Sequence, residues 1–160
     1  MEIARIDGHN RKDIDDFIRE HWFTTEMVID GRIVDMTKAE GFYALEDGKI
    51  VGLITFLIQD GGCEITSLDS LLENRGVGTE LVNRVIGEAK ERGCGQVTVV
   101  TTNDNTRAIR FYQKRGFDMA QFRRGALERS RELKPAIPLL GNDGIPLRHE
   151  IEFQLSLDNE

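Results

Sequence analysis

The stretch Glu73-Asn74-Arg75-Gly76-Val77-Gly78 is the most informative part of this sequence, because it leads directly into a segment with helical periodicity. Apolar residues recur there about every 3.6 positions, at Val77, Leu81, Val82, Val85, Ile86 and Ala89. Gly93 is well placed to end this helix. N–H groups in the first turn of a helix lack an intrahelical partner and carry the positive end of its dipole. Glycines let a ligand approach the backbone closely, so this turn suits a diphosphate.

Two other phosphate-binding motifs do not fit this turn. A dinucleotide-binding fingerprint requires a third glycine at the position of Leu81. The P-loop of nucleoside triphosphatases requires Gly-Lys followed by Ser or Thr, which no suitable glycine loop here provides. Gly76 and Gly78 alone also fit an ordinary turn between a strand and a helix, so the interpretation depends on a second motif.

That second motif lies downstream. Val97–Thr102 is rich in β-branched residues and predicts a buried strand, and a helix is predicted at about Thr106–Arg115. Around this helix the chain reads Asn105-x-x-Ala108-x-x-Phe111-Tyr112-x-Lys114-x-Gly116-Phe117. Together with Arg75-Gly76-Val77-Gly78, this pattern closely resembles the GNAT superfamily of acetyl-CoA-dependent N-acetyltransferases. The resemblance covers about residues 41–117.

The resemblance implies a mixed α/β fold, a single GNAT-like domain with a twisted, mostly antiparallel central sheet flanked by helices. About six to seven strands are expected, within the usual range for sheets. The sheet would splay between its fourth and fifth strands, after a bulge near Leu68–Leu71. Pantetheine would enter this opening, and the diphosphate would lie on amides of about residues 74–79.

The resemblance also assigns a set of residues to acetyl-CoA, which acts as co-substrate. These are Leu68, Asp69, Ser70, Asn74, Arg75, Gly76, Val77, Gly78, Thr79, Asn105, Ala108 and Phe111. Asn105 would both cap its helix and lie near the pantetheine arm. The family usually has Gln or Arg where Glu73 stands, so Arg75 is the candidate for a side-chain contact to phosphate.

The implied chemistry is direct attack of an amine on the thioester carbonyl in a ternary complex, with no metal and no covalent enzyme intermediate. The amide of Leu68 would stabilise the oxyanion, and Tyr112 would protonate the leaving sulfur. Glu64, which by simple alternation shares a strand face with Thr66 and Leu68, would deprotonate the amine, either directly or through water. Two alternatives stay open, because Tyr112 also fits a core aromatic residue and Glu64 a solvated carboxylate.

The remaining elements follow from local patterns. Strands are predicted at Glu2–Ile6, Gly41–Leu45, Lys49–Gln59, Cys63–Leu71, Phe117–Arg123 and around Ile151–Leu157. A helix is predicted from Asp13, and Asp47-Gly48 predicts a tight hairpin. Met27–Lys38, which Gly31 interrupts, is interpreted as a loop or a short helix.

The C-terminal part is longer than the simplest pattern of the family. Arg123–Lys134 is basic and is expected to be a solvated helix face, with a phosphate, an acidic acceptor or a subunit contact as alternatives. A proline-rich excursion follows, and its apolar residues, including Leu133, Leu139 and Leu140, are expected to be buried. It would cover the acceptor site or form a dimer contact. We predict one domain over residues 1–160, with a cofactor-binding core at 41–117 and the excursion and last strand at 118–160.

Composition narrows the class of protein further. A net charge of −7 argues against nucleic acid as the partner. The longest apolar run, Ile50–Ile58, has about half of the ~20 residues that a membrane-crossing helix needs, and no signal-peptide stretch precedes it. Cys63 and Cys94 cannot form a metal cage. We therefore expect a cytoplasmic N-acetyltransferase that acts on a primary amine of a small molecule, with a homodimer left open. The alternatives are a non-catalytic acyl-CoA-binding sensor and a protein N-acetyltransferase.

Overall fold

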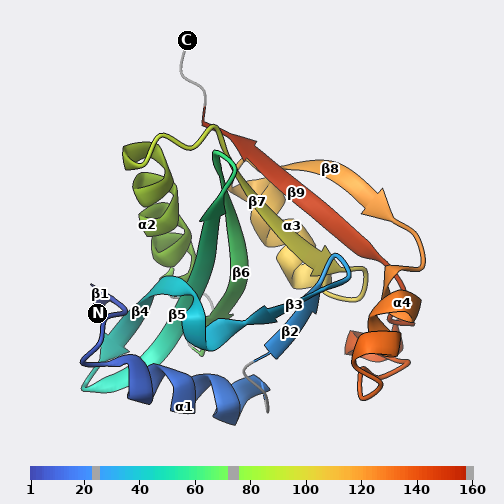
Figure 1. Ribbon diagram of the computed structural model, residues 1–160, viewed down its shortest axis with the longest axis horizontal. Coiled ribbons are helices and arrows are strands. Elements are labelled where there is room, and N and C mark those ends of the chain that lie inside the picture. The colour runs from blue at the N-terminus through green and yellow to red at the C-terminus, as the bar shows by residue number, and fades with distance from the viewer. Residues whose placement is uncertain (23–25, 72–75, 158–160) are drawn as a thin grey trace.

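The computed structural model describes residues 1–22, 26–71 and 76–157. Its main sheet has seven strands in the order β1-β4-β5-β6-β7-β9-β8 (Figure 1). In that order the strands span Glu2–Arg5, Glu40–Glu46, Lys49–Gln59, Gly62–Ser70, Gln96–Thr102, Glu150–Ser156 and Asp118–Arg123. Every neighbouring pair in this sheet is antiparallel except β6 and β7. The predicted mixed, mostly antiparallel sheet is therefore confirmed.

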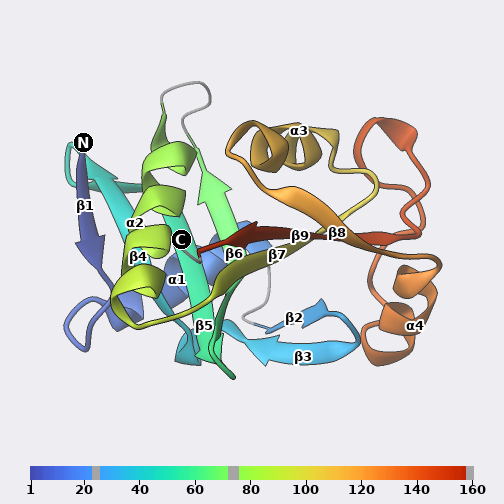
Figure 2. The ribbon, with the colours of Figure 1, turned by 90° about the horizontal axis from the view of Figure 1, so that it is seen from above.

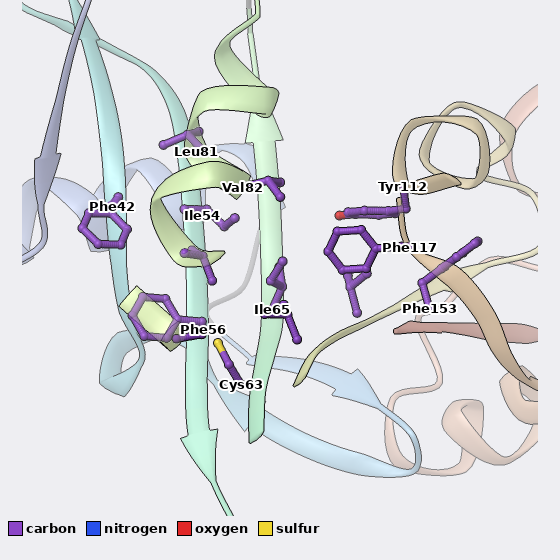
Figure 3. Close-up of a cluster of buried hydrophobic side chains, with 14 of the residues drawn as sticks. Phe42, Ile54, Phe56, Cys63, Ile65, Leu81, Val82, Tyr112, Phe117 and Phe153 are labelled. Carbon is purple, nitrogen blue, oxygen red and sulfur yellow. The ribbon is translucent and has the colours of Figure 1, made fainter. Parts of the chain in front are cut away.

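Helices cover both faces of this sheet (Figure 2). On one face lie α2 (Val77–Glu91) and α3 (Thr106–Lys114). Leu81 and Val82 of α2 lie near Phe42, Ile54 and Phe56, whereas Tyr112 of α3 lies beside Phe117 and Phe153 (Figure 3). On the other face lie α1 (Arg11–Trp22) and a small hairpin of β2 (Glu26–Ile29) and β3 (Arg32–Asp35). The first helix thus begins two residues before Asp13. None of the described helices is both long enough and apolar enough to cross a membrane.

The interpretation of Met27–Lys38 as a loop or short helix is wrong for most of its length. These residues form β2, β3 and a single 3-10 turn at Met36–Lys38. Asp30 and Gly31 join the two strands with φ values of 51° and 72°. Two successive left-handed residues are what a two-residue hairpin turn needs. The turns at Asp47-Gly48 and Asp60-Gly61 have the same conformation.

The sheet opens between β6 and β7, which are its fourth and fifth strands in spatial order, as predicted. They pair only where Cys63, Glu64 and Ile65 lie beside Val97, Thr98 and Val99. Beyond Ile65 and Val99 they diverge (Figures 1 and 2), and we call this divergence the opening.

The bulge in β6 is at Thr66 and not near Leu68–Leu71, which corrects that prediction. Ile65 pairs with Phe56, and Ser67 pairs with the adjacent Thr55, so Thr66 is the additional residue. The Thr55 hydroxyl is hydrogen-bonded to those of Thr66 (2.7 Å) and Ser67 (2.6 Å), and all three residues are buried. These buried hydrogen bonds stabilise the bulge.

The excursion between β8 and β9 contains α4 (Ala126–Leu133) and a loop that hydrogen bonds hold in place. The expectation that its apolar residues are buried is wrong for those with the largest exposed fractions, Leu133 (49%), Leu139 (73%) and Leu140 (61%). Instead, Asn103 Oδ1 accepts from the backbone N–H of Arg148 (2.9 Å), and Asp104 Oδ2 accepts from that of Asn142 (2.9 Å). The loop is thereby fixed to the segment between β7 and α3.

Candidate active site

At the N-terminus of α2, the first-turn backbone N–H groups have no acceptor among the residues that the structure describes. Gly76 caps the helix in the left-handed conformation (φ 76°, ψ 6°) and provides no side-chain hydrogen bond. The first-turn N–H groups of Val77, Gly78 and Thr79 therefore have no helical partner. Asn74 and Arg75, which were predicted to bind the cofactor, lie outside the described residues. The described part of the predicted diphosphate site is thus a set of amides at the positive end of a helix dipole.

The first turn of α2 lies against α3. A Cβ built on Gly78 would be 3.4 Å from Phe111 Cζ, an ordinary van der Waals contact, so Gly78 faces the Phe111 ring. Arg115 strengthens the contact, because its Nε and Nη2 donate to Thr79 Oγ1 at 2.9 and 2.7 Å. Its guanidinium also stacks on the Phe111 ring at 4.3 Å. Arg115 was missing from the predicted set, although it stands directly before Gly116 of the second motif.

The backbone of β6 directs donors into the opening. The N–H of Leu71 donates to the carbonyl of Val51 at 2.8 Å, which makes these two residues a hydrogen-bonded pair of the antiparallel ladder. Hydrogen-bonded pairs alternate along such a ladder, so Asp69 also bonds toward β5. Leu68 and Ser70 therefore direct their N–H and C=O groups away from β5, toward the side where β7 has diverged.

The start of α3 confirms one part of the prediction for Asn105, namely that it caps this helix. Asn105 Oδ1 accepts a hydrogen bond from the N–H of Ala108 at 3.1 Å, so the residue caps the helix. This cap positions the helix that carries Phe111 and Tyr112.

Tyr112 is buried, with an exposed fraction of 4%. Its ring centroid lies 5.3, 5.5 and 5.8 Å from those of Phe111, Phe117 and Phe153. Its hydroxyl points toward β6 (Figure 3). Burial, with a smaller contribution from the charge of Asp69, raises the pKa of Tyr112 above its ordinary value. The phenol therefore stays protonated at neutral pH, and the residue is a core aromatic whose hydroxyl is directed toward the strand that borders the opening.

Glu64 and Leu68 face opposite sides of the sheet, so the expectation that they share a face is wrong. Glu64 pairs with Leu57, which packs on the α1 face, whereas Leu68 pairs with Ile54, which packs under α2. The cause is the bulge at Thr66, which reverses the alternation along β6. A prediction from strict alternation cannot account for such an additional residue.

The Glu64 carboxylate is paired with a side chain that the sequence did not indicate. Both of its oxygens accept from Arg32 Nη2 of β3, at 2.9 and 2.8 Å. The hydrogen bond to Glu64 is the largest cause of the raised pKa of Arg32. Since only 20% of the Glu64 side chain is exposed, it is not a freely solvated strand carboxylate.

A cavity of about 330 Å³ contains this ion pair. Its lining residues are Asp30, Arg32, Leu57, Gln59, Asp60, Gly62, Cys63, Glu64, Gln96, Thr98 and Glu152. Glu64 and Thr98 are adjacent to Ile65 and Val99, the last pair before β6 and β7 diverge. The cavity therefore reaches the narrow end of the opening, on the face opposite α2 and α3.

Arg123 supports one wall of this cavity and does not lie on a solvated helix face as expected. Arg123 is the last residue of β8, and the five strand residues before it are exposed. It forms ion pairs with Asp30 (3.1 Å), Glu150 (3.6 Å) and Glu152. Arg124 and Arg129 of the same basic stretch are exposed, in agreement with the expectation. Within the described ranges, no three His, Cys, Asp or Glu side chains are arranged to hold a metal ion.

Comparison with known proteins agrees with this geometry. Residues 8–117 match the Acetyltransferase (GNAT) family. The chain is 45% identical over 144 residues to the uncharacterized protein YdhI of Bacillus subtilis (strain 168), covering 89% of this chain and 90% of YdhI. Its fold is similar to those of an IAA acetyltransferase from Bacillus cereus ATCC 14579 and a Bacillus subtilis acetyltransferase in complex with CoA. For both structures the TM-score is 0.72, the identity 20%, and the coverage 98% of this chain and 99% of the other.

A sheet that opens beside a helix with unpaired N-terminal amides thus defines an acetyltransferase fold. The protein belongs to the acetyltransferase (GNAT) family.

Proposed function

We propose that this protein transfers the acetyl group of acetyl-CoA directly to a primary amine of a small molecule in the cytoplasm. The observation that carries the proposal is the convergence of two features on the opening. The Leu68 and Ser70 backbone groups are directed into it from β6, and the protonated Tyr112 hydroxyl points toward β6 from α3.

Acetyl-CoA supplies the activated acyl group as a thioester. Its diphosphate would rest on the amides of Val77, Gly78 and Thr79 and on Gly76. Contacts to Asn74 and Arg75, which lie outside the described residues, are part of the same proposal. Its pantetheine arm would extend along the backbone of Leu68–Ser70, between β6 and the side of α3 that carries Asn105, Ala108 and Phe111.

The reaction requires two proton transfers. As the amine nitrogen attacks the thioester carbonyl, Glu64 takes its proton and the Leu68 N–H donates to the developing oxyanion. When the carbon–sulfur bond breaks, Tyr112 gives its proton to the sulfur, and solvent restores both groups. Cys63 does not carry the acetyl group, because burial raises the pKa of its thiol to about 12.

A small acceptor is supported by the cavity beside Glu64. Its volume of about 330 Å³ is at the lower end for small-molecule sites. A protein N-acetyltransferase would need an exposed groove for a peptide at this position. A non-catalytic sensor of acyl-CoA would need no phenol directed toward the opening.

Calorimetric titration with acetyl-CoA, together with release of free thiol across an amine library, tests this proposal. Binding and amine-dependent release are the expected result. Binding without release by any amine favours the sensor, whereas release only with peptides favours the protein acetyltransferase. If acetyl-CoA does not bind, the assignment of the α2 amides is refuted.

A further inference from the structure

The cavity beside Glu64 is surrounded by more negative than positive charge. Among its described lining residues, four have carboxylates, namely Asp30, Asp60, Glu64 and Glu152, whereas Arg32 is the one cation. The wall behind Asp30 and Glu152 adds one carboxylate, Glu150, and two cations that act on it, Arg123 and Arg129. With five carboxylates and three guanidinium groups, the surroundings of the cavity have a formal charge of −2.

Two of these carboxylates retain unused hydrogen-bonding capacity. Asp60 forms neither a hydrogen bond nor an ion pair with any residue that the structure describes. Glu150 is 2% exposed, and its Oε1 has no hydrogen-bond partner within the same ranges, although Arg123 lies 3.6 Å away. Burial raises the pKa of Glu150, because the neighbouring donors and cations do not fully offset the loss of water around its charged form. A further cation in the cavity would offset this excess of negative charge.

Asp60 and Glu64 lie at opposite ends of the same segment of chain. Glu64 is next to the narrow end of the opening, while Asp60 is in the Asp60-Gly61 turn that begins β6. They are four positions apart in the sequence, so their Cα atoms lie at most roughly 13 Å apart at the rise of a strand. One extended molecule can therefore present an amine at Glu64 and a second charged group near Asp60.

We infer that this cavity binds the acceptor and selects a small molecule that carries a second cationic amine besides the one that is acetylated. The inference rests on the proposed function and adds the substrate class. The reacting amine displaces Arg32 from Glu64 or shares the carboxylate with it. The distal ammonium lies near Asp60 and remains protonated.

Matched pairs of amines test the inference on the intact protein. The rate of thiol release is measured with hexylamine against 1,6-diaminohexane, and with butylamine against 1,4-diaminobutane. A diamine has two reactive ends, which alone doubles its kcat/KM. We expect the ratio of diamine to monoamine to exceed this twofold factor in at least one pair, and to fall as salt is added, because salt screens partly exposed charges.

Asp60→Asn tests whether the Asp60 carboxylate causes the preference for diamines over monoamines. Asparagine also tolerates the left-handed conformation of Asp60, so the turn is retained. We expect the diamine-to-monoamine ratio to fall about two- to fivefold, the usual range for a partly exposed ion pair. Asp47→Asn is the matched control, since Asp47 occupies the same position of another hairpin turn (φ 52°) and does not line the cavity.

The outcomes separate this inference from the proposed function. If amines are acetylated but no pair exceeds the twofold factor, or if Asp60→Asn and Asp47→Asn leave the ratio equally unchanged, the substrate class is refuted while the acetyltransferase stands. If no amine supports thiol release, the proposed function fails, and this inference fails with it.

Discussion

Tyr112→Phe removes one hydroxyl group and keeps the aromatic ring, so it separates the role of Tyr112 in the core from its proposed role in proton transfer. The ring contacts Phe111, Phe117 and Phe153, and phenylalanine preserves these contacts. The hydroxyl makes no hydrogen bond with the part of the chain that the structure describes. We therefore expect the free energy of unfolding to change by less than about 1 kcal/mol, whereas kcat falls about 10²- to 10⁴-fold, the usual contribution of a general acid.

Thiol release at saturating acetyl-CoA and amine measures kcat, calorimetry measures the affinity for CoA, and urea unfolding measures stability. Tyr43→Phe is the control, because Tyr43 is the other tyrosine of the chain and its hydroxyl accepts a hydrogen bond from Asn10 Nδ2 (3.0 Å). We expect this control to lose about 1 kcal/mol of stability and to retain its kcat. The reasoning is refuted if Tyr112→Phe retains the kcat of the wild type across the pH range.

The pH dependence adds a second test. Since the pKa of Tyr112 is raised above its ordinary value of 10.0, the phenol remains a proton donor below about pH 10. The raised pKa also means that the folded state favours the protonated phenol. Its contribution to stability is therefore complete below about pH 10 and is lost as the pH rises through the folded-state pKa. Above pH 10 the wild type should lose stability more steeply than Tyr112→Phe.

Three further predictions concern the elements that surround the opening. Gly76→Ala should destabilise the protein by about 1–2 kcal/mol, because the φ of Gly76 is 76°. Gly87→Ala, in open space within α2, should instead stabilise it by about 0.5–1 kcal/mol. Urea unfolding that gives the two changes in free energy the same sign would contradict this prediction. Arg115→Ala breaks the link between α3 and the first turn of α2 and should weaken CoA binding about fivefold, roughly 1 kcal/mol, whereas equal affinity by calorimetry would show that the link is dispensable. Hydrogen bonds, chiefly from Arg5, lower the pKa of Glu88, so its stabilising contribution is present above its ordinary pKa of 4.5 and is lost as the pH falls through the lowered value. Glu88→Gln should then be less stable than the wild type at neutral pH, and urea unfolding in acid should show this difference vanish.

Local sequence patterns predicted most of the sheet and helices. The largest error in secondary structure, the missed hairpin of β2 and β3, could have been avoided from the sequence itself. Asp47-Gly48 was recognised as a hairpin turn, and Asp30-Gly31 is the same dipeptide in the same left-handed conformation. Gly31 was interpreted as an interruption of this segment. The flanking strands are only four residues each, and two of their apolar side chains, Ile29 and Val34, are buried in a cluster with residues of α1 and β5. Consistent use of the Asp-Gly signal would have found the hairpin that carries Arg32.

The other differences could not be predicted from local patterns. The ion pair between Arg32 and Glu64 joins residues that are 32 positions apart, and Arg123 reaches Glu152 from the edge of the sheet. Leu139 and Leu140 were expected to be buried because burial was treated as a property of residue type. Their loop is stabilised instead by hydrogen bonds to Asn103 and Asp104, so its apolar side chains are left exposed.

The bulge at Thr66 connects the two halves of the proposed reaction. Before the bulge, Glu64 faces the cavity on the α1 side of the sheet, where the acceptor is proposed to bind. After it, the Leu68 side chain packs under α2, while its N–H is directed into the opening. If β6 continued in regular alternation through Thr66, Glu64 and Leu68 would share a face, and the residues that follow Thr66 would bond to β5 in the opposite alternation. The bulge, held by buried hydroxyls, therefore places the proposed base, Glu64, on the cavity side of β6, while the N–H of Leu68, the proposed donor to the thioester, is directed into the opening.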